Sequence, residues 1–328
     1  MNEAKWPLVS VIMPCYNQAR FAVECLESVK AQNYPNLELI ISDDASTDGS
    51  VALVRAWLAQ NPSIPRRLLT SKRNQGLCRS LNRAMSHARG TYISGIAADD
   101  VWLPGKLLTQ VELMERLPSR VGIVYSNALQ MDEDGNLLPQ RFLEANGHSE
   151  PMPEGDILES LWRGNFIPAM STLVRRKCYQ RVGLFDESLF FEDWDMWLRL
   201  AHFFEFAYSD QVSAKYRLSS HSMIRAYFPR LVDSACLVCV KHLQAGTVEG
   251  QTRAIAVERL YNAAIEAYEL ASPEHKRNLM RALRFRPTPG LALRCIFALC
   301  GVKAESFASL TRPLRYERPR PHPVRSEG

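Results

Sequence analysis

The sequence of 328 residues lacks several patterns that would assign it at once to a well-marked class of protein. It contains no run of about 18 apolar residues, which argues against a membrane-spanning helix. No G-x-G-x-x-G follows the first expected strand and no Walker A lysine motif occurs, so dinucleotide-binding and P-loop proteins lose support. No secretory signal peptide is recognisable at the N-terminus, which favours a cytoplasmic protein.

Zinc-binding spacing is also missing, although eight cysteines are scattered along the chain. Only Cys236 and Cys239 form a C-x-x-C pair, and no second pair or histidine partner lies at the spacing of a zinc site. The pair falls in an apolar, helix-like stretch, so we expect buried free thiols rather than metal ligands. Free thiols are typical of a reducing compartment, in agreement with a cytoplasmic location.

What the chain contains is ordinary for a globular protein, with 46% hydrophobic and 23% charged residues and room for one large or two modest domains. The formal net charge is +5, and residues 289–328 contribute +4 of it, from seven Lys/Arg and three acidic residues. A basic tail suits an anionic membrane surface or nucleic acid, and a solvated tail is the plain alternative. We expect no nucleic-acid partner, and disorder over the last ten residues.

Apolar runs alternate with helical spacing through the first hundred residues, which predicts a β-α-β-α-β-α-β order and a doubly wound α/β sheet. The expected strands are residues 9–15, 37–42, 67–70 and 93–97. Further strands are expected at 121–126, 171–175 and 212–218, with a hairpin turn at 132–136 and a helix at 193–201. We expect three regions: residues 1–225, a helical region at 226–286, and a basic tail at 287–328 that begins after Pro287 and Pro289.

Polar clusters follow four of these strands or their loops, where an open parallel sheet binds its ligands. They are Pro14-Cys15-Tyr16-Asn17, Asp43-Asp44-Ala45-Ser46-Thr47-Asp48, Lys72-Arg73-Asn74-Gln75-Gly76 and Asp99-Asp100. A carboxylate after the second strand suits a base N–H or ribose hydroxyls, and the adjacent pair Asp99-Asp100 suits a hard cation such as Mg²⁺ or Mn²⁺. Helix caps, solvated turns and surface loops remain the alternatives.

A second acidic group, Glu192-Asp193-Trp194-Asp195, follows Phe190-Phe191 at the start of an expected helix. Neighbouring aromatic rings and like charges raise a carboxyl pKa toward that of a general base. The helix N-terminus opposes this effect by favouring the ionised form, and helix capping is the alternative role.

Taken together in their order, six segments resemble family 2 glycosyltransferases of the GT-A fold. The segments are residues 9–17, 41–48, 74–76, 98–104, 182–187 and 192–199, and the resemblance covers roughly residues 7–225. It implies a Rossmann-like, mostly parallel sheet flanked by helices, here with a helical C-terminal extension. It also implies inverting sugar transfer from a nucleoside-diphosphate sugar, with UDP favoured and Mg²⁺ or Mn²⁺ as cofactor.

By position in these motifs, the resemblance implies that Asp193 is the catalytic base and that Asp99 and Asp100 contact ribose and the metal–diphosphate. The implied donor-binding residues are Pro14, Tyr16, Asn17, Asp43, Asp44, Arg73, Asn74, Gly76, Asp99 and Arg217, and the implied metal ligands are Asp99, Asp100 and His221. His221 is displaced by three residues from the common spacing, and a structural histidine is the alternative.

One departure from the family pattern concerns the metal site. The family often shows Asp-x-Asp-Asp at this strand end, and Ala97 occupies the first position here. The leading hypothesis remains an inverting enzyme of bacterial surface polysaccharide or lipopolysaccharide synthesis. It would act on a glycan or lipid-linked acceptor and would be peripheral at the inner face of the membrane through residues 286–318.

Two other classes remain open. Ala97 motivates a sugar-nucleotide-binding or scaffold protein without catalysis, which the retained Asp193 and Asp43 oppose. A nucleotidyltransferase would normally need a Gly-rich basic loop after the first strand, and residues 14–18 offer none.

Overall fold

The computed structural model describes residues 6–191, 193–219 and 227–311. The first third of the chain forms a parallel sheet in the order β3-β2-β1-β4, as the alternation of apolar runs and helical spacing predicts. Its strands are β1 (Val9–Cys15), β2 (Leu37–Asp43), β3 (Arg66–Thr70) and β4 (Tyr92–Gly95). The connecting helices are α1 (Ala22–Lys30), α2 (Ser50–Gln60) and α3 (Leu77–Met85), so every crossover brings the next strand back in the same direction.

The sheet continues with strands of mixed direction, in the order β8-β6-β9-β5, and β7 pairs with β6. These strands are β5 (Val101–Trp102), β6 (Val121–Met131), β7 (Leu137–Arg141), β8 (Leu173–Arg175) and β9 (Glu205–Arg217). The pair β6–β9 is parallel, whereas β4–β8, β6–β8, β6–β7 and β5–β9 are antiparallel. The predicted hairpin turn is confirmed, since Asp132 N donates to Asn136 O at 3.0 Å between β6 and β7. Strands β6 and β9 extend beyond the expected ranges.

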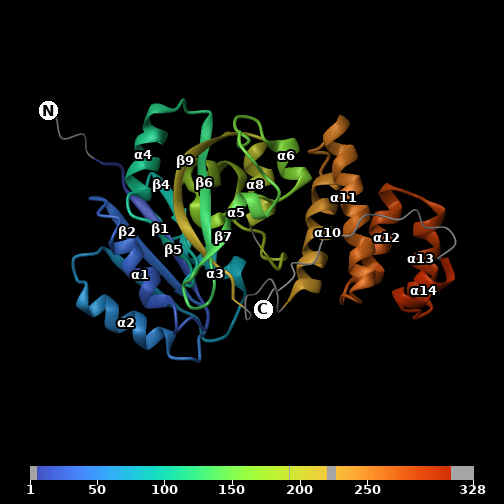
Figure 1. The fold of residues 1–328 in the computed structure, drawn as a ribbon, viewed down its shortest axis with the longest axis horizontal. Helices are drawn as coiled ribbons and strands as arrows, with labels where there is room; N and C mark the ends of the chain where they lie inside the picture. The colour runs from blue at the N-terminus through green and yellow to red at the C-terminus, as the bar shows by residue number, and fades with distance from the viewer. Residues whose placement is uncertain (1–5, 192, 220–226, 312–328) are drawn as a thin grey trace.

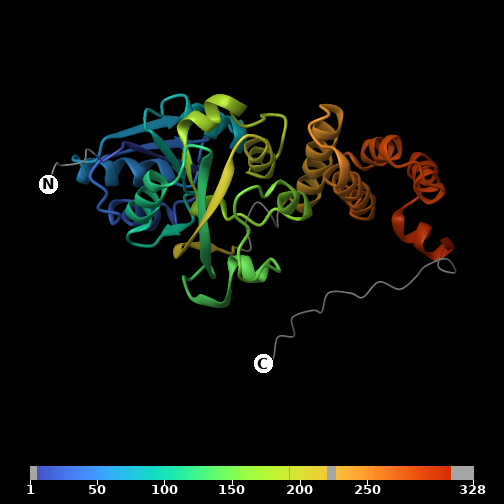
Figure 2. The ribbon, with the colours of Figure 1, turned by 90° about the horizontal axis from the view of Figure 1, so that it is seen from above.

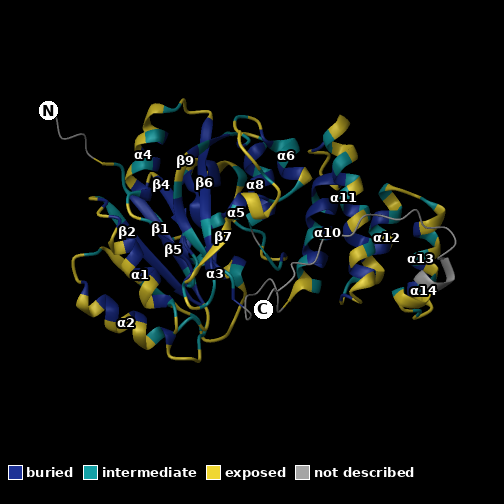
Figure 3. Ribbon diagram, in the orientation of Figure 1, coloured by how far each residue is buried: buried dark blue, intermediate teal, exposed yellow. Residues whose placement is uncertain are grey.

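The helices of this second half are α4 (Lys106–Arg116), α5 (Phe142–Ala145), α6 (Leu158–Arg163), α7 (Arg176–Val182) and α8 (Asp193–Ala201). Two hydrophobic cores lie on opposite faces of the sheet, and side chains along β1 alternate between them. Val11 and Met13 belong to the core that α1, α2 and α4 cover, while Ile12 belongs to the core that α3 and α8 cover. Because both faces are covered, β1 at the centre of the parallel half is buried along almost its whole length (Figure 3).

The described part of the chain ends in a run of helices that extends to one side of the sheet (Figures 1 and 2). They are α10 (Phe228–Gln244), α11 (Gly250–Glu269), α12 (His275–Phe285), α13 (Pro289–Leu299) and α14 (Ala304–Thr311). The helical region expected at residues 226–286 is therefore three helices over its described part, separated by short turns. Buried residues of α10 to α13 belong to the same core as α6 and α8, so these helices pack onto the sheet domain.

The expected state of the cysteines is confirmed: all eight are free thiols, and Cys236 and Cys239 are buried in α10. Within the described ranges, no helix combines the length and apolarity needed to cross a membrane. His221 and the last ten residues, for which the sequence made specific predictions, lie outside the described residues.

Candidate functional site

The predicted polar clusters meet at one edge of the parallel half of the sheet, because β1, β2, β3 and β4 all end there. Cys15, the last residue of β1, lies beside Asp43 at the end of β2, and Asp44 N donates to Cys15 O at 2.9 Å. Pro14 is the penultimate residue of β1, and Tyr16 follows that strand with 46% of its surface exposed. An uncovered ring at a strand end offers a flat apolar face for a planar ligand.

Asp43 is buried and joins the loops after β1 and β2. Its carboxylate accepts hydrogen bonds from Ser46 N at 3.0 Å and from Ser46 Oγ at 2.5 Å. Ser46 Oγ in turn accepts from Asn17 N at 2.9 Å, and Asn17 Oδ1 accepts from Thr47 N at 2.9 Å. Asn17 has a φ of 52°, a left-handed conformation that asparagine tolerates better than most residues. The two loops therefore form one hydrogen-bonded body beside Tyr16.

Asp44 also joins two loops: the loop after β2, in which it lies, and the loop between β3 and α3. Its buried carboxylate accepts from Gln75 N at 3.0 Å and from Gly76 N at 2.8 Å, at the start of α3. Asn74 Oδ1 also accepts from Gly76 N, at 3.0 Å. Gly76 has a φ of 94°, which a side chain would strain, so the glycine is required for this turn. Asp44, Asn74 and Gly76 shape the loop, and Arg73 is exposed on it.

A polar cavity of about 360 Å³ adjoins this loop. Its lining residues are Asp44, Ser71, Gln75, Arg79, Ser80, Arg83 and Glu187. Arg83 was not identified from the sequence, yet its guanidinium donates to Ser42 Oγ at 2.9 Å, Asp43 O at 2.8 Å and Ser71 Oγ at 2.5 Å. The helical spacing of α3 gave no signal for these contacts, because they depend on where α3 packs against β2 and β3.

Asp99 and Asp100 follow β4 at the same edge of the sheet. Asp100 is 3% exposed and Asp99 is half-buried. Burial raises the pKa of both carboxyl groups, and the charge of Asp99 raises the pKa of Asp100 further. Arg217 opposes these shifts, since its backbone N–H donates to Asp100 Oδ1 at 3.0 Å. The adjacent carboxylates are therefore poorly compensated by positive charge.

Arg217 is 2% exposed, and its guanidinium faces acceptors of the protein itself. Its Nε donates to Asp99 O at 2.8 Å, its Nη2 pairs with Glu24 at 2.5 Å, and its Nη1 lies 3.3 Å from the carbonyl oxygens of Asp132 and Glu133. The guanidinium also stacks 4.4 Å above the Phe21 ring. These contacts fix the Asp99 backbone to α1 and to the β6–β7 hairpin, so Arg217 supports the acidic pair from behind.

Asp99 and Asp100 fit a hard divalent cation, because their carboxylates offer only oxygen atoms as ligands. Burial also raises the pKa of both groups. Over the part of the chain that the structure describes, no group of three His, Cys, Asp or Glu residues is placed to hold a metal. Two protein carboxylates suit Mg²⁺ or Mn²⁺ when substrate phosphates and water complete the coordination.

Asp193 opens α8 and is half-buried. Burial raises the pKa of its carboxyl group, although the Asn165 side chain and the Trp194 N–H, which donates to Asp193 Oδ1 at 2.7 Å, act in the opposite direction. A carboxylate with a raised pKa is suited to accept a proton. Asn165 was not identified from the sequence, since it lies in the irregular segment between α6 and β8.

The family comparison bears on both acidic sites. Residues 10–182, more than half of the chain, match the family described as Glycosyl transferase family 2. The chain belongs to this family. A relative named as a glycosyltransferase, EpsE of Bacillus subtilis, is 34% identical over 239 residues, which are 71% of this chain and 81% of EpsE. The protein is therefore a glycosyltransferase.

Solved structures of other glycosyltransferases share the fold of this glycosyltransferase. The Staphylococcus aureus TarS 1–349 complex with UDP-GlcNAc has a TM-score of 0.65 and 16% identity, covering 94% of this chain and 93% of that one. The mannosyltransferase PcManGT of Pyrobaculum calidifontis, in complex with GDP-Man and Mn²⁺, has a TM-score of 0.58 and 20% identity, covering 94% and 81%. The predicted GT-A fold with a helical C-terminal region is confirmed.

Proposed function

We propose that this glycosyltransferase moves a sugar, with inversion, from a nucleoside-diphosphate sugar to a hydroxyl group of a glycan or lipid-linked acceptor. The observation that carries the proposal is the presence of two acidic sites with raised carboxyl pKa values: Asp99-Asp100 at the strand edge, and Asp193 at the start of α8. UDP is the favoured nucleotide, and bacterial surface polysaccharide or lipopolysaccharide synthesis is the favoured process. The UDP-GlcNAc complex of TarS, a neighbour in fold, supports a UDP-sugar.

The donor site is assigned to the strand edge. Tyr16 and Pro14 would pack against the base, Asp43 would receive a base N–H or a ribose hydroxyl, and Arg73 would reach the nucleotide from its exposed position. Asn17, Asp44, Asn74 and Gly76 act mainly by holding these loops, as their hydrogen bonds indicate. Arg217 holds the backbone of Asp99 and so orients the acidic pair.

Asp99 and Asp100 are the residues that would hold Mg²⁺ or Mn²⁺, which when bound neutralises charge on the leaving diphosphate. Asp193 takes the proton of the acceptor hydroxyl as that oxygen attacks the anomeric carbon. The new C–O bond forms on the face of the anomeric carbon opposite the diphosphate. The bond between that carbon and the diphosphate breaks, and the diphosphate leaves with the electron pair. Attack from the opposite face inverts the configuration at the anomeric carbon.

A second candidate is a protein that binds the sugar nucleotide without turning it over, which Ala97 favours. In the family's common pattern an acidic residue stands at this position. Alanine has no side-chain oxygen to offer a metal, and the Ala97 backbone oxygen accepts a hydrogen bond from Asp100 N at 3.1 Å. The two candidates differ in whether UDP is released from the donor.

The test is a screen of nucleotide sugars with and without Mn²⁺, by thermal shift and by release of nucleoside diphosphate. The Asp193→Asn variant should bind donor like the wild type and release UDP about a thousandfold more slowly, within the range for loss of a general base. Asp210→Asn, at an exposed position on β9, is the matched control. Tight UDP binding without turnover on any acceptor would instead favour the second candidate.

A peripheral membrane contact at the inner face of the membrane belongs to the same proposal. On α13, Leu291, Cys295 and Ala298 are buried, while the opposite face exposes Leu293, Ile296 and Leu299 by 39%, 57% and 59%. An exposed apolar helix face within the basic segment 289–328 suits an anionic lipid surface. The protein should sediment with phosphatidylglycerol vesicles and less with phosphatidylcholine vesicles. Replacing Leu293, Ile296 and Leu299 by serine should abolish that binding.

A further inference from the structure

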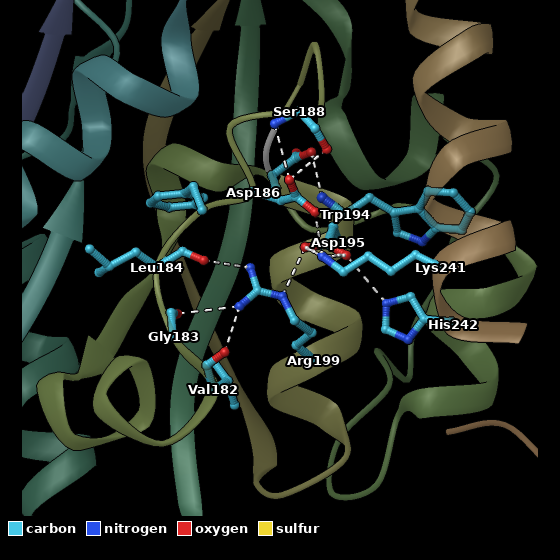
Figure 4. Close-up of polar contacts among 12 residues, drawn as sticks. Val182, Gly183, Leu184, Asp186, Ser188, Trp194, Asp195, Arg199, Lys241 and His242 are labelled. Carbon is cyan, nitrogen blue, oxygen red and sulfur yellow. Dashed lines mark hydrogen bonds and ion pairs between the residues drawn. The ribbon is translucent and has the colours of Figure 1, made fainter. Parts of the chain in front are cut away.

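A buried charge cluster lies two residues beyond the proposed base, centred on Asp195 of α8 (Figure 4). The Asp195 carboxylate is 1% exposed and receives Arg199 Nε at 2.8 Å and Lys241 Nζ at 3.0 Å. His242 Nε2 lies 3.3 Å from Asp195 Oδ1. Burial alone would raise the pKa of Asp195, but the adjacent His242 ring and the charges of Arg199 and Lys241 hold it well below its usual range.

The same cations hold the segment that leads into α8. Arg199 donates to the carbonyl oxygens of Val182 at 2.8 Å, Leu184 at 3.0 Å and Gly183 at 3.3 Å. Lys241 Nζ also pairs with Asp186 at 2.8 Å. Figure 4 shows Asp195 at the centre, with Arg199 reaching the loop on one side and Lys241 and His242 of α10 on the other. Residues 182–186 and helix α8 are therefore held by the same cations, Arg199 and Lys241.

Lys241 and His242 differ from Asp195 and Arg199 in their place in the fold, because they belong to α10, in the C-terminal helices. Lys241 lies well beyond residue 182, where the family match ends. It is the residue that joins Asp186 before α8 to Asp195 within α8, from an element that contributes none of the proposed donor or base residues.

We propose that Lys241 is a positioning residue for Asp193, and that the C-terminal helices thereby take part in forming the active site. Asp193 is the first residue of α8 and lies in the sequence between Asp186 and Asp195, the two residues that Lys241 binds. A shift of the first turn of α8 would therefore move the base. A displacement of about 1 Å at a reacting group can cost on the order of a hundredfold in rate. This inference rests on the proposed function, since it assigns Asp193 as the base.

Lys241→Met tests the proposal, because methionine keeps most of the aliphatic length and removes the charge. UDP release from the donor with Mn²⁺ should fall in kcat by about ten- to a hundredfold, while KM for the donor stays within about twofold. Lys241→Arg should recover most of kcat, since a guanidinium can also reach two carboxylates. Lys276→Met, at an exposed position on α12, is the matched control and should behave as wild type.

The split between kcat and KM distinguishes positioning from a general contribution to stability. A folded Lys241→Met protein with wild-type kcat would overturn the proposal, and so would a loss of donor affinity equal to the loss of kcat. If Lys241→Met does not fold, Asp186→Asn decides the question, because it removes the loop partner alone and should lower kcat in the same way. Failure of the wild type to release UDP from any donor would overturn the proposed function itself, and this inference with it.

Discussion

Two groups of buried aspartates in this glycosyltransferase differ in how their charge is compensated. At the strand edge, Asp99 and Asp100 are adjacent; burial raises the pKa of both carboxyl groups, and the charge of Asp99 raises that of Asp100 further. In α8, Asp195 is at least as deeply buried, yet its pKa is held low by Arg199, Lys241 and His242. Burial is common to both groups, so the difference comes from the supply of positive charge.

Within the described residues, Asp99 and Asp100 are poorly compensated by positive charge, whereas Asp195 is already paired with cations of the same chain. An uncompensated buried charge destabilises the fold, and such charges are typical of sites where a ligand supplies the opposite charge. A carboxylate surrounded by cations of the same chain has little to offer a ligand, and its role is to hold elements together. We therefore expect the same Asp→Asn substitution to have opposite effects on stability in the two groups.

The largest effect is expected for Asp195→Asn. The variant leaves Arg199 and Lys241 without their shared buried partner, and removal of one member of a buried ion pair costs about 3 kcal/mol or more in unfolding free energy. Urea unfolding of the variant and the wild type at pH 7 measures the difference. Asp210→Asn, on the surface, should change stability by less than about 0.5 kcal/mol.

The pH dependence of the stability lost in Asp195→Asn follows from the lowered pKa of Asp195. Because the folded-state pKa of Asp195 is lowered, its stabilisation is present above the unfolded value of about 3.9 and is lost as pH falls through the folded value. The cost of Asp195→Asn should therefore stay constant from about pH 5 to pH 8. A variant as stable as wild type across this range would show that the Asp195 ion pairs add no net stability.

The next effect concerns Mn²⁺ and the acidic pair. Mn²⁺ with UDP at a hundredfold excess over Kd should stabilise the wild type by about 2.7 kcal/mol. Asp99→Asn and Asp100→Asn should lose most of this Mn²⁺-dependent part, whereas Asp210→Asn should keep it. Full Mn²⁺ dependence in both variants of the pair would place the metal ligands elsewhere.

The same comparison shows what could be predicted from the sequence. Strand-end motifs were predictable because a parallel βα repeat brings the ends of its strands to one edge, whatever the details of packing. The residues of the acidic pair and the parallel half of the sheet followed from short apolar runs and from the motif order. The pairing directions beyond β4 did not follow, since strands as short as β5, Val101–Trp102, leave almost no periodicity.

The partners of the buried charges were not predictable for a related reason. Arg217 pairs with Glu24, a residue 193 positions away for which no role was predicted. Lys241 meets Asp195 across 46 positions, whereas the acidic residues at the start of α8 were predicted only as a base or a helix cap. Which acid a given cation meets is decided by how helices pack on the sheet, and local spacing carries no signal for it.

The smallest effect is the most direct test of the contrast, and it concerns Asp100→Asn without metal. Asparagine keeps an oxygen that can accept the Arg217 N–H and removes the buried charge beside Asp99. Because the folded-state pKa of Asp100 is raised, the wild type loses stability as pH rises above the unfolded value of about 3.9. Metal-free Asp100→Asn should therefore be more stable than wild type by about 1 kcal/mol at pH 8, with the difference vanishing toward pH 4. A variant less stable than wild type at pH 8 would mean that the acidic pair is compensated in the fold as Asp195 is, and the distinction between the two groups would fail.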